Sequence, residues 1–426
     1  MASWRAALHR CAEQPVHDST EAQNEEYEHG PQREIQSGIP RFFVKKKVPS
    51  SELAQKFGEA AYAEFISFQR NSLLSNEELD ILWDALLERA TGETDEERQI
   101  SYADFDQINS TLPAKFRSFF KPSCYMRFVE EDDGTISVLQ FFNYVLRKVS
   151  LLQARLDLSV YDDDRDGYLT EEDLQRYVAD LIPSLNLHTL SKSFHKFYLC
   201  TASRKFGFFL DPMRRGKIGI QNILLSPILT ELFELREPEL PKDYERSNWF
   251  SAYSSLRVYG QFLNLDTDRN GMLSRSELGK YNSGSLTDLF LDRVFQECQT
   301  YGGEMDYRTF LDFVLAVENI QTPEAISYCF RMLDIKGEGY LDEHTIMYFF
   351  KAVADKMMSM GHETVGIRDV KNEVFDMANP QMSDRITLTD LIKCGVGGTI
   401  IKMLCDVQGF WSYETREVPD PSKTTA

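Results

Sequence analysis

The sequence contains no run of about 18 apolar residues, which is roughly the length that a helix needs to cross a bilayer. It also lacks an excess of basic residues, because 67 Asp and Glu outnumber 47 Lys and Arg and give a formal net charge of −20. Since neutralisation of phosphates supplies most non-specific affinity for nucleic acid, this balance argues against a general nucleic-acid binder. We therefore expect neither a membrane span nor a nucleic-acid partner.

Paired cysteines and catalytic motifs are missing as well. The seven cysteines are odd in number and none stand in a C-x-x-C pair, which favours reduced thiols in a cytosolic or nuclear protein. There is no G-x-S-x-G turn, no phosphate-binding G-x-x-x-x-G-K-[ST] loop and no H-E-x-x-H helix. The sequence thus gives no positive case for an enzyme, and we expect neither catalytic residues nor an organic cofactor.

Apolar material is ample, since 42% of the residues are hydrophobic and 12% are aromatic. A length of 426 residues favours two to four globular units at roughly 150 residues per unit. Residues 1–38 are polar without clear periodicity, so we expect a flexible N-terminal arm. Within the following segment, 39–90, apolar residues recur at helical spacing, with Phe57, Phe65 and Phe68 on one face, which predicts an N-terminal helical segment.

The rest of the chain repeats a short cassette: an aliphatic residue or Met, a polar residue, about three more residues, and an apolar residue that opens a helix. The cassettes begin at Ile100, Ile136, Leu169, Ile218, Leu273, Met305, Leu341 and Ile386. This pattern predicts an all-α fold of tandem helix–loop–helix pairs, up to four in number (100/136, 169/218, 273/305 and 341/386). A hinge in the Pro-rich segment 237–241 would give an elongated array of two lobes, 91–236 and 237–416, before a C-terminal tail, 417–426.

Two of the loops carry a specific set of oxygen donors. In the twelve-residue loop of an EF-hand, donors stand at positions 1, 3, 5, 7, 9 and 12, and a Gly at position 6 permits the sharp turn. Calcium requires this density because it takes six to eight oxygens at roughly 2.3–2.6 Å. Loop 266–277 meets every requirement, with predicted ligands Asp266, Asp268, Asn270, the carbonyl of Met272 and Glu277, and with Ser274 as a direct or water-bridged donor. Loop 162–173 offers Asp162, Asp164, Asp166, the carbonyl of Tyr168 and Asp173.

The first loop departs from the pattern at position 12, where Asp173 replaces the usual Glu. The shorter carboxylate reaches less far and binds more often through one oxygen, which weakens calcium binding and makes magnesium competitive. We expect two calcium sites, of which 266–277 is the tighter. The alternative is that both loops serve only as turns and that their oxygen donors are solvated. The full sets of donors argue against this alternative.

The other six loops lack essential donors, and we interpret them as scaffolding. Loop 211–222 has Met213 at position 3 and Arg215 at position 5, and loop 334–345 has Lys336 at position 3. Position 8 of such loops can still form the short β-bridge that joins paired hands. The basic part of the first of these loops, 211–217, could instead contact an acidic partner.

Long aromatic strings give a more specific signal than the loops. They lie at Phe141–Val149, Lys205–Pro212, Asn248–Ser251, Asp288–Phe295, Phe310–Asn319 and Gly409–Glu414. Together they resemble the B-double-prime regulatory subunits of protein phosphatase 2A, among them the gamma type and the plant Tonneau/Fass protein. The resemblance covers about residues 39–417.

This resemblance implies a non-catalytic subunit that docks on the phosphatase scaffold and catalytic subunits and directs them to substrates, with calcium tuning the assembly. It also implies a role at centrosomes or cortical microtubules, and hence cytoskeletal or centrosomal partners. We expect the protein in the cytoplasm and on the cytoskeleton, with the nucleus as a further location. The alternative is an EF-hand scaffold of the cytoskeleton that acts without the phosphatase.

Overall fold

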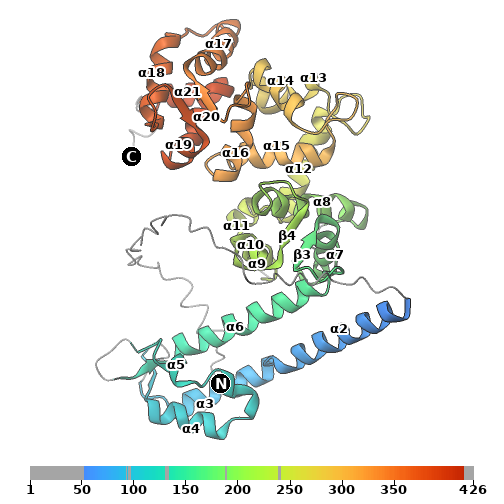
Figure 1. Ribbon diagram of the computed structural model, residues 1–426, viewed down its shortest axis with the longest axis vertical. Coiled ribbons are helices and arrows are strands. Elements are labelled where there is room, and N and C mark those ends of the chain that lie inside the picture. Colours follow the sequence, from blue (N-terminus) through green and yellow to red (C-terminus); the bar gives the residue numbers. More distant parts are fainter. Residues whose placement is uncertain are drawn as a thin grey trace, which may run out of the picture. The chain divides into compact units, whose positions relative to one another are not determined.

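The computed structural model describes residues 52–416, apart from residues 93, 95–96, 130–133, 188–189 and 238–240 (Figure 1). The predicted arm 1–38, the tail 417–426 and most of the predicted hinge lie outside the described residues. Contacts between residues divide the chain into two compact units, Met1–Val160 and Tyr161–Ala426. Among the helices that are described, none combines the length and the apolar character needed to cross a bilayer.

The first unit is built around two long helices that run side by side, α2 (Glu52–Ser72) and α6 (Val138–Ser159). The hydroxyl of Tyr62 on α2 donates to the backbone carbonyl of Ser159 at 2.9 Å, and Arg70 pairs with Asp157 at 2.7 Å. The other elements of this unit are α3 (Asn76–Arg89), β1 (Gln99–Ile100), α4 (Tyr102–Thr111), the 3₁₀ helix η1 (Ala114–Ser118), α5 (Pro122–Tyr125) and β2 (Ile136–Ser137). They pack around a core of aromatic rings, among them Trp83 and Phe142, whose centroids are 4.8 Å apart.

The predicted N-terminal helical segment is confirmed over α2 and α3, but its two apolar faces differ in burial. Leu79 and Leu82 of α3 are buried in the core of the first unit. By contrast, Phe57, Phe65 and Phe68 of α2 remain exposed, at 68%, 53% and 68%. The aromatic face of α2 is therefore left open among the residues that the structure describes.

Among the described residues, the second unit contains the remaining helices and two of the three small sheets. Its first part holds β3 (Tyr168–Thr170), α7 (Glu171–Leu181), the 3₁₀ helices η2 (Ile182–Ser184) and η3 (Lys192–Phe194), α8 (His195–Leu210), β4 (Lys217–Gly219), α9 (Ile220–Leu225), α10 (Pro227–Glu234) and α11 (Lys242–Ser247). Its middle holds α12 (Ala252–Leu265), α13 (Arg275–Leu278), the 3₁₀ helix η4 (Tyr281–Gly284), α14 (Asp288–Glu297), α15 (Tyr307–Glu318) and α16 (Pro323–Leu333). Its last part holds β5 (Tyr340–Asp342), α17 (Glu343–Ser359), α18 (Ile367–Ala378), β6 (Arg385–Thr387), α19 (Leu388–Lys393), α20 (Gly397–Cys405) and α21 (Val407–Glu414). The predicted all-α class is confirmed.

Short antiparallel bridges join the cassettes in the predicted pairs. The bridged residues are Ile100 with Ile136, Leu169 with Ile218, Leu273 with Met305, and Leu341 with Ile386. All eight are nearly or completely buried. The polar residue that follows the bridge residue explains why a helix starts there, because its side chain caps the helix by accepting a hydrogen bond from a free backbone N–H. Such caps are Ser101, Ser137, Thr170, Ser274, Asp306, Asp342 and Thr387, whereas Gly219 after Ile218 provides none.

The division between the two units does not coincide with the hinge predicted near residue 237. Within the second unit, side chains from both sides of that position contact one another. The indole N–H of Trp249 donates to the carbonyl of Thr201 at 3.0 Å, and Asn248 donates to the carbonyl of Glu231 at 2.7 Å. The division into lobes 91–236 and 237–416, which was inferred from the sequence repeats, stays a prediction. The boundary between the two compact units of the structure lies after Val160.

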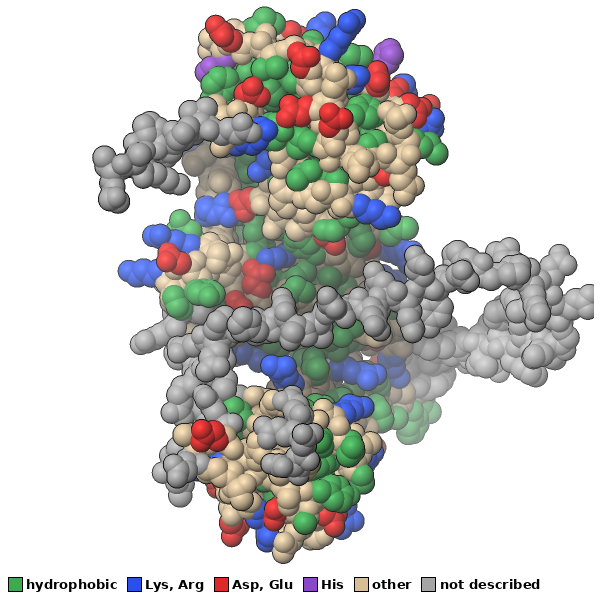
Figure 2. All heavy atoms as spheres, turned by 90° about the vertical axis from the view of Figure 1, so that its left-hand side faces the viewer, with side chains coloured by type: hydrophobic (Ala, Val, Ile, Leu, Met, Phe, Trp, Pro, Cys, Tyr) green, Lys and Arg blue, Asp and Glu red, His purple; other side chains and the backbone are tan. Residues whose placement is uncertain are grey.

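Most of the aromatic strings form the core rather than a surface. Phe206 and Phe250 are fully buried with ring centroids 5.5 Å apart, and Phe310 and Phe313 are also fully buried, whereas Trp411 is exposed. On the face in Figure 2, the described Asp and Glu side chains are interspersed with Lys and Arg, without a field of a single sign.

Candidate metal centres

Loop 266–277 follows directly from the end of α12. The backbone N–H of Asp266 donates to Phe262, and the Asp266 carboxylate then accepts hydrogen bonds from the N–H groups of Asn270 at 3.1 Å and Gly271 at 3.0 Å. Gly271 lies at φ +79°, a left-handed conformation that favours glycine over residues with a Cβ. The chain leaves the turn through the Leu273–Met305 bridge and enters α13, so that side chains at the start and the end of the loop face each other.

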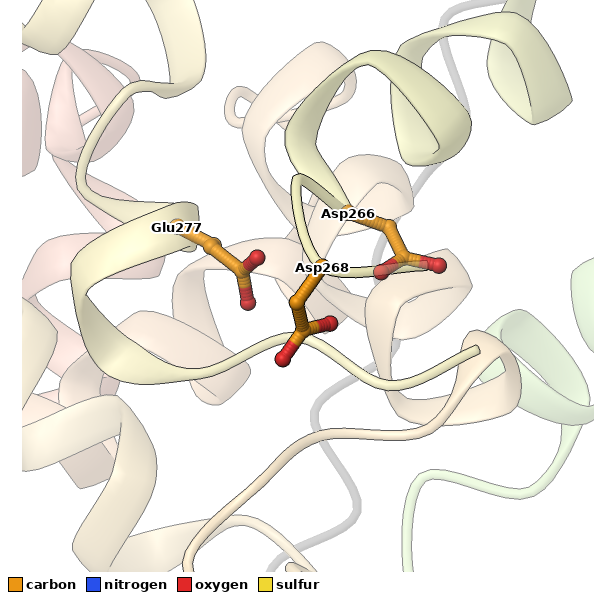
Figure 3. Close-up of side chains that lie close together, drawn as sticks. All are labelled: Asp266, Asp268 and Glu277. Carbon is orange, nitrogen blue, oxygen red and sulfur yellow. The ribbon is translucent and has the colours of Figure 1, made fainter. Parts of the chain in front are cut away.

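Three carboxylates converge in this loop (Figure 3). Asp266 lies at the end of α12, Asp268 in the turn and Glu277 on α13, and one oxygen of each lies within 4.8 Å of the others. Asp266 and Glu277 are only 5% and 6% exposed. Among the described residues, no other group of three or more acidic, His or Cys side chains gathers in this way. An oxygen-only set of partly buried carboxylates fits a hard divalent cation such as Ca²⁺.

Glu277 is held in its charged form by hydrogen bonds. One carboxylate oxygen accepts from the backbone N–H and the hydroxyl of Thr267, both at 2.8 Å, and the other accepts from the N–H and hydroxyl of Ser274 at 2.9 and 2.8 Å. Burial raises the pKa of Glu277, but these hydrogen bonds outweigh it and lower the pKa to about 2. The carboxylate is therefore ionised, as a metal ligand must be.

The remaining predicted ligands of this loop lie beside the carboxylates. The amide oxygen of Asn270 accepts from the N–H of Met272 at 2.7 Å, and its amide nitrogen donates to Glu304 at 3.1 Å. The hydroxyl of Ser274 is engaged with Glu277 as the cap of α13. The roles of Asn270, Met272 and Ser274 as oxygen donors stay predictions.

Loop 162–173 forms the same turn, but the structure does not bring its carboxylates together. Asp162 accepts from the backbone N–H groups of Asp166 at 3.1 Å and Gly167 at 2.8 Å, as Asp266 does in the other loop. Asp164 is exposed, and the exposed Tyr168 donates its backbone N–H to Asp166 at 2.9 Å. Among the described residues, no three carboxylates of this loop have oxygens within 4.8 Å of one another. The ligand roles of Asp162, Asp164, Asp166, Tyr168 and Asp173 stay predictions.

Basic side chains pair with three carboxylates in the first loop, two of which are predicted ligands. Arg176 pairs with Asp173 at 2.5 Å and with Asp163 at 2.8 Å, and Lys217 of β4 pairs with Asp166 at 2.7 Å. Burial raises the pKa of Asp173, but hydrogen bonds from Thr170 and Arg176 outweigh it and lower the pKa. Sequence reasoning missed both cations. Arg176 could have been found as the basic residue three positions after the last ligand, but Lys217 becomes relevant only through the pairing of β3 with β4.

Two of the loops interpreted as scaffolding, 211–222 and 334–345, form the same turn. Asp211 accepts from the backbone N–H groups of Arg215 and Gly216 at 2.9 and 2.7 Å. In loop 334–345, Lys336 at position 3 pairs with Asp342 at 2.6 Å. Among the described residues, these loops carry no cluster of metal-binding side chains.

Comparisons with known proteins agree with this picture. The family model described as "EF hand" matches residues 260–280, which include the loop with the three converging carboxylates. The gamma-type B'' regulatory subunit of serine/threonine-protein phosphatase 2A from Danio rerio is 49% identical over 383 residues, covering 89% of this chain and 84% of that protein. The human protein of the same name is 48% identical over 387 residues, covering 90% and 85%. The probable B'' regulatory protein TON2 of Arabidopsis thaliana is 40% identical over 406 residues, covering 91% and 84%.

A solved structure is similar as well. A PP2A PR70 holoenzyme, labelled "diCa", aligns with a TM-score of 0.53 and 26% identity over 58% of this chain and 93% of that chain. The helix–loop–helix pairs and the oxygen-rich loop place the protein in the class of EF-hand proteins. The chain belongs to the B'' family of regulatory subunits of serine/threonine-protein phosphatase 2A. The resemblance and the non-catalytic role expected from the sequence are thereby confirmed.

Proposed function

We propose that the protein is a calcium-binding targeting subunit that joins the scaffold and catalytic subunits of protein phosphatase 2A and directs them to substrates. The observation that carries the calcium-binding part is the convergence of Asp266, Asp268 and Glu277 within 4.8 Å. The names of the relatives and of the PR70 holoenzyme support the phosphatase part. The contribution to catalysis is positional, because a bound substrate is held at high effective concentration near an active site on another chain.

Calcium would be held by Asp266, Asp268 and Glu277, with Asn270, Met272 and Ser274 as further donors. It supplies positive charge that offsets the mutual repulsion of the carboxylates. Asp266 directly follows α12 and Glu277 lies on α13, so a bound ion would connect the ends of these two helices. The buried Leu273–Met305 bridge connects this loop to the start of α15. We expect loop 162–173 to bind more weakly, with Mg²⁺ as a competitor, through Asp162, Asp164, Asp166, Tyr168 and Asp173.

The cellular role is proposed from the resemblance to Tonneau/Fass and gamma-type subunits. We propose partners at centrosomes or cortical microtubules and a location in the cytoplasm and on the cytoskeleton, with the nucleus as a further location. The 40% identity to TON2 supports this assignment. Fluorescence imaging of the tagged full chain, with tubulin as a marker, tests it. A diffuse distribution that does not change when microtubules are depolymerised would contradict it.

Affinity purification of the tagged full chain from cell lysate tests the phosphatase assembly, with free calcium at micromolar levels or removed by a chelator. We expect the scaffold and catalytic subunits to be recovered with calcium, and in smaller amounts with chelator or with Asp266→Asn. Asp334→Asn is the matched control. Asp334 also stands at position 1 of its loop and accepts from two backbone N–H groups, at 3.1 and 2.8 Å, but its loop lacks the ligand set. Failure to recover either phosphatase subunit under all conditions would instead favour the cytoskeletal scaffold.

A further inference from the structure

The two calcium loops face partner loops through equivalent bridges. Leu169 of the first loop pairs with Ile218, and Leu273 of the second loop pairs with Met305. In each partner loop, the residue directly before the bridge residue contacts position 5 of the calcium loop. That residue is Lys217 opposite the first loop and Glu304 opposite the second. Structurally equivalent positions therefore carry opposite charges.

The contacts at these positions are direct. The Lys217 ammonium lies 2.7 Å from a carboxylate oxygen of Asp166. The Glu304 carboxylate accepts from the side-chain amide of Asn270, with its two oxygens at 3.1 and 3.3 Å from the nitrogen. Position 5 supplies a metal ligand in an EF-hand loop, so both side chains reach the edge of the proposed ion site.

Two cations contact carboxylates of the first loop. Lys217 pairs with the predicted ligand Asp166 at 2.7 Å. Arg176 contributes a second cation through Asp173 and Asp163. In the second loop the equivalent of Arg176 is Lys280, three residues after Glu277, and it contacts the hydroxyl of Thr267 at 3.2 Å rather than a ligand carboxylate.

We propose that Lys217 and Glu304 set the order in which the two loops take up calcium. Lys217 acts as an internal counter-cation that an entering ion must displace from Asp166, which weakens the first loop. Glu304 adds negative charge beside the second loop and strengthens it. This inference rests on the proposed calcium binding, and it assigns the difference between the loops to their partner loops as well as to the Asp at position 12.

Calorimetric titration of the full chain with Ca²⁺ in low salt tests the inference, with each loop measured in a background that silences the other. In a Glu277→Gln background, Lys217→Gln is expected to tighten binding at the first loop about tenfold, since a unit charge is removed a few ångströms from a divalent ion. In an Asp162→Asn background, Glu304→Gln is expected to weaken the second loop by a similar factor. Both effects are expected to shrink in 0.5 M KCl because salt screens exposed charges.

Lys192→Gln is the matched control, because it removes the same charge from an exposed residue of the second unit that belongs to neither the two loops nor their partner loops. Lys217→Arg is expected to restore the weak binding, and Lys217→Met, which keeps the aliphatic stem, is a second neutral variant should Gln disturb the β3–β4 pair. If the neutral Lys217 variants bind calcium no more tightly than Lys192→Gln, the inference is wrong while the proposed calcium binding stands. A wild-type chain that takes up no calcium would overturn both.

Discussion

A buried ion pair between α8 and α15 lets the energetics of the second unit be tested quantitatively. Asp312 of α15 is 6% exposed, and its two oxygens accept three hydrogen bonds from the guanidinium of Arg204, at 2.6, 2.6 and 3.0 Å. The third nitrogen of Arg204 donates to Glu171 at 3.0 Å. Replacement of Asp312 by Ala would remove the main counter-charge of a largely buried cation.

The expected cost follows from this geometry. Removal of one partner from a buried ion pair costs roughly 3–5 kcal/mol, because the other charge is left without compensation. In the variant, Arg204 still pairs with Glu171, and it lines a cavity of about 350 Å³ in which water can solvate its charge. We therefore expect a loss at the lower end of this range, about 3 kcal/mol. For a unit of this size, that corresponds to a decrease in Tm of about 6–12 °C.

Urea unfolding of the full chain, in chelator to exclude contributions from bound metal, measures this loss of free energy of unfolding. The double variant Arg204→Met/Asp312→Leu replaces both charges by apolar groups of similar size and is expected to be more stable than Asp312→Ala. Asp384→Ala, which removes an exposed carboxylate paired with Arg385, is the control and is expected to leave the urea midpoint unchanged. A loss below about 1 kcal/mol for Asp312→Ala, or a double variant less stable than the single one, would refute the electrostatic argument.

Other substitutions test the loops themselves. The double variant Lys336→Asp/Thr345→Glu completes the oxygen pattern of loop 334–345 and is expected to add one calcium ion to the calorimetric stoichiometry. The single variant Thr345→Glu, which keeps Lys336 at position 3, is expected to leave the stoichiometry unchanged. Gly271→Ala is expected to lower the free energy of unfolding in urea by about 1 kcal/mol, because a residue with a Cβ is disfavoured at φ +79°. No atom lies within 4 Å of the position that the Cβ would take, so steric overlap adds nothing. An unchanged free energy of unfolding would contradict this expectation. The pKa of Glu277 is lowered on folding from 4.5 to about 2, so its stabilising effect is complete above pH 4.5 and is lost as the pH falls toward 2. The difference in urea midpoint between wild type and Glu277→Gln, measured in chelator, should therefore shrink as the pH falls from 4.5 toward 2. A difference that stays constant over these pH values would contradict the lowered pKa of Glu277.

The repeat pattern predicted the bridge pairs because one short cassette encodes two structural features. The aliphatic residue, such as Leu169 or Leu273, is buried in the bridge, and the polar residue after it caps the next helix. Both requirements act within a few residues and are visible in the sequence. The turn formed by Asp266 and Gly271 is local in the same sense, and it was predicted for the same reason.

The features that sequence reasoning missed depend on contacts between distant segments. Lys217 is 51 positions away from Asp166, and only the pairing of β3 with β4 brings the two charges together. The contact of Trp249 with Thr201 likewise spans 48 positions across the predicted hinge. The exposure of Phe57 on α2 could not be predicted because helical spacing identifies an apolar face but not what covers it.

Arg204 also links the two pairs of loops, which limits how calcium can act on the second unit. Its partner Glu171 stands two residues before the proposed ligand Asp173, and its partner Asp312 lies on the helix that follows Met305. If either pair of loops rearranged and moved one of these carboxylates away, the buried guanidinium would keep only one acidic partner. The rearranged state would then be destabilised by a free energy on the order of kcal/mol. The shared arginine therefore favours a fixed arrangement of α8 and α15 whether or not the loops hold an ion. Any change on calcium binding is then expected at the loop ends and in the short helix α13, where Glu277 is attached.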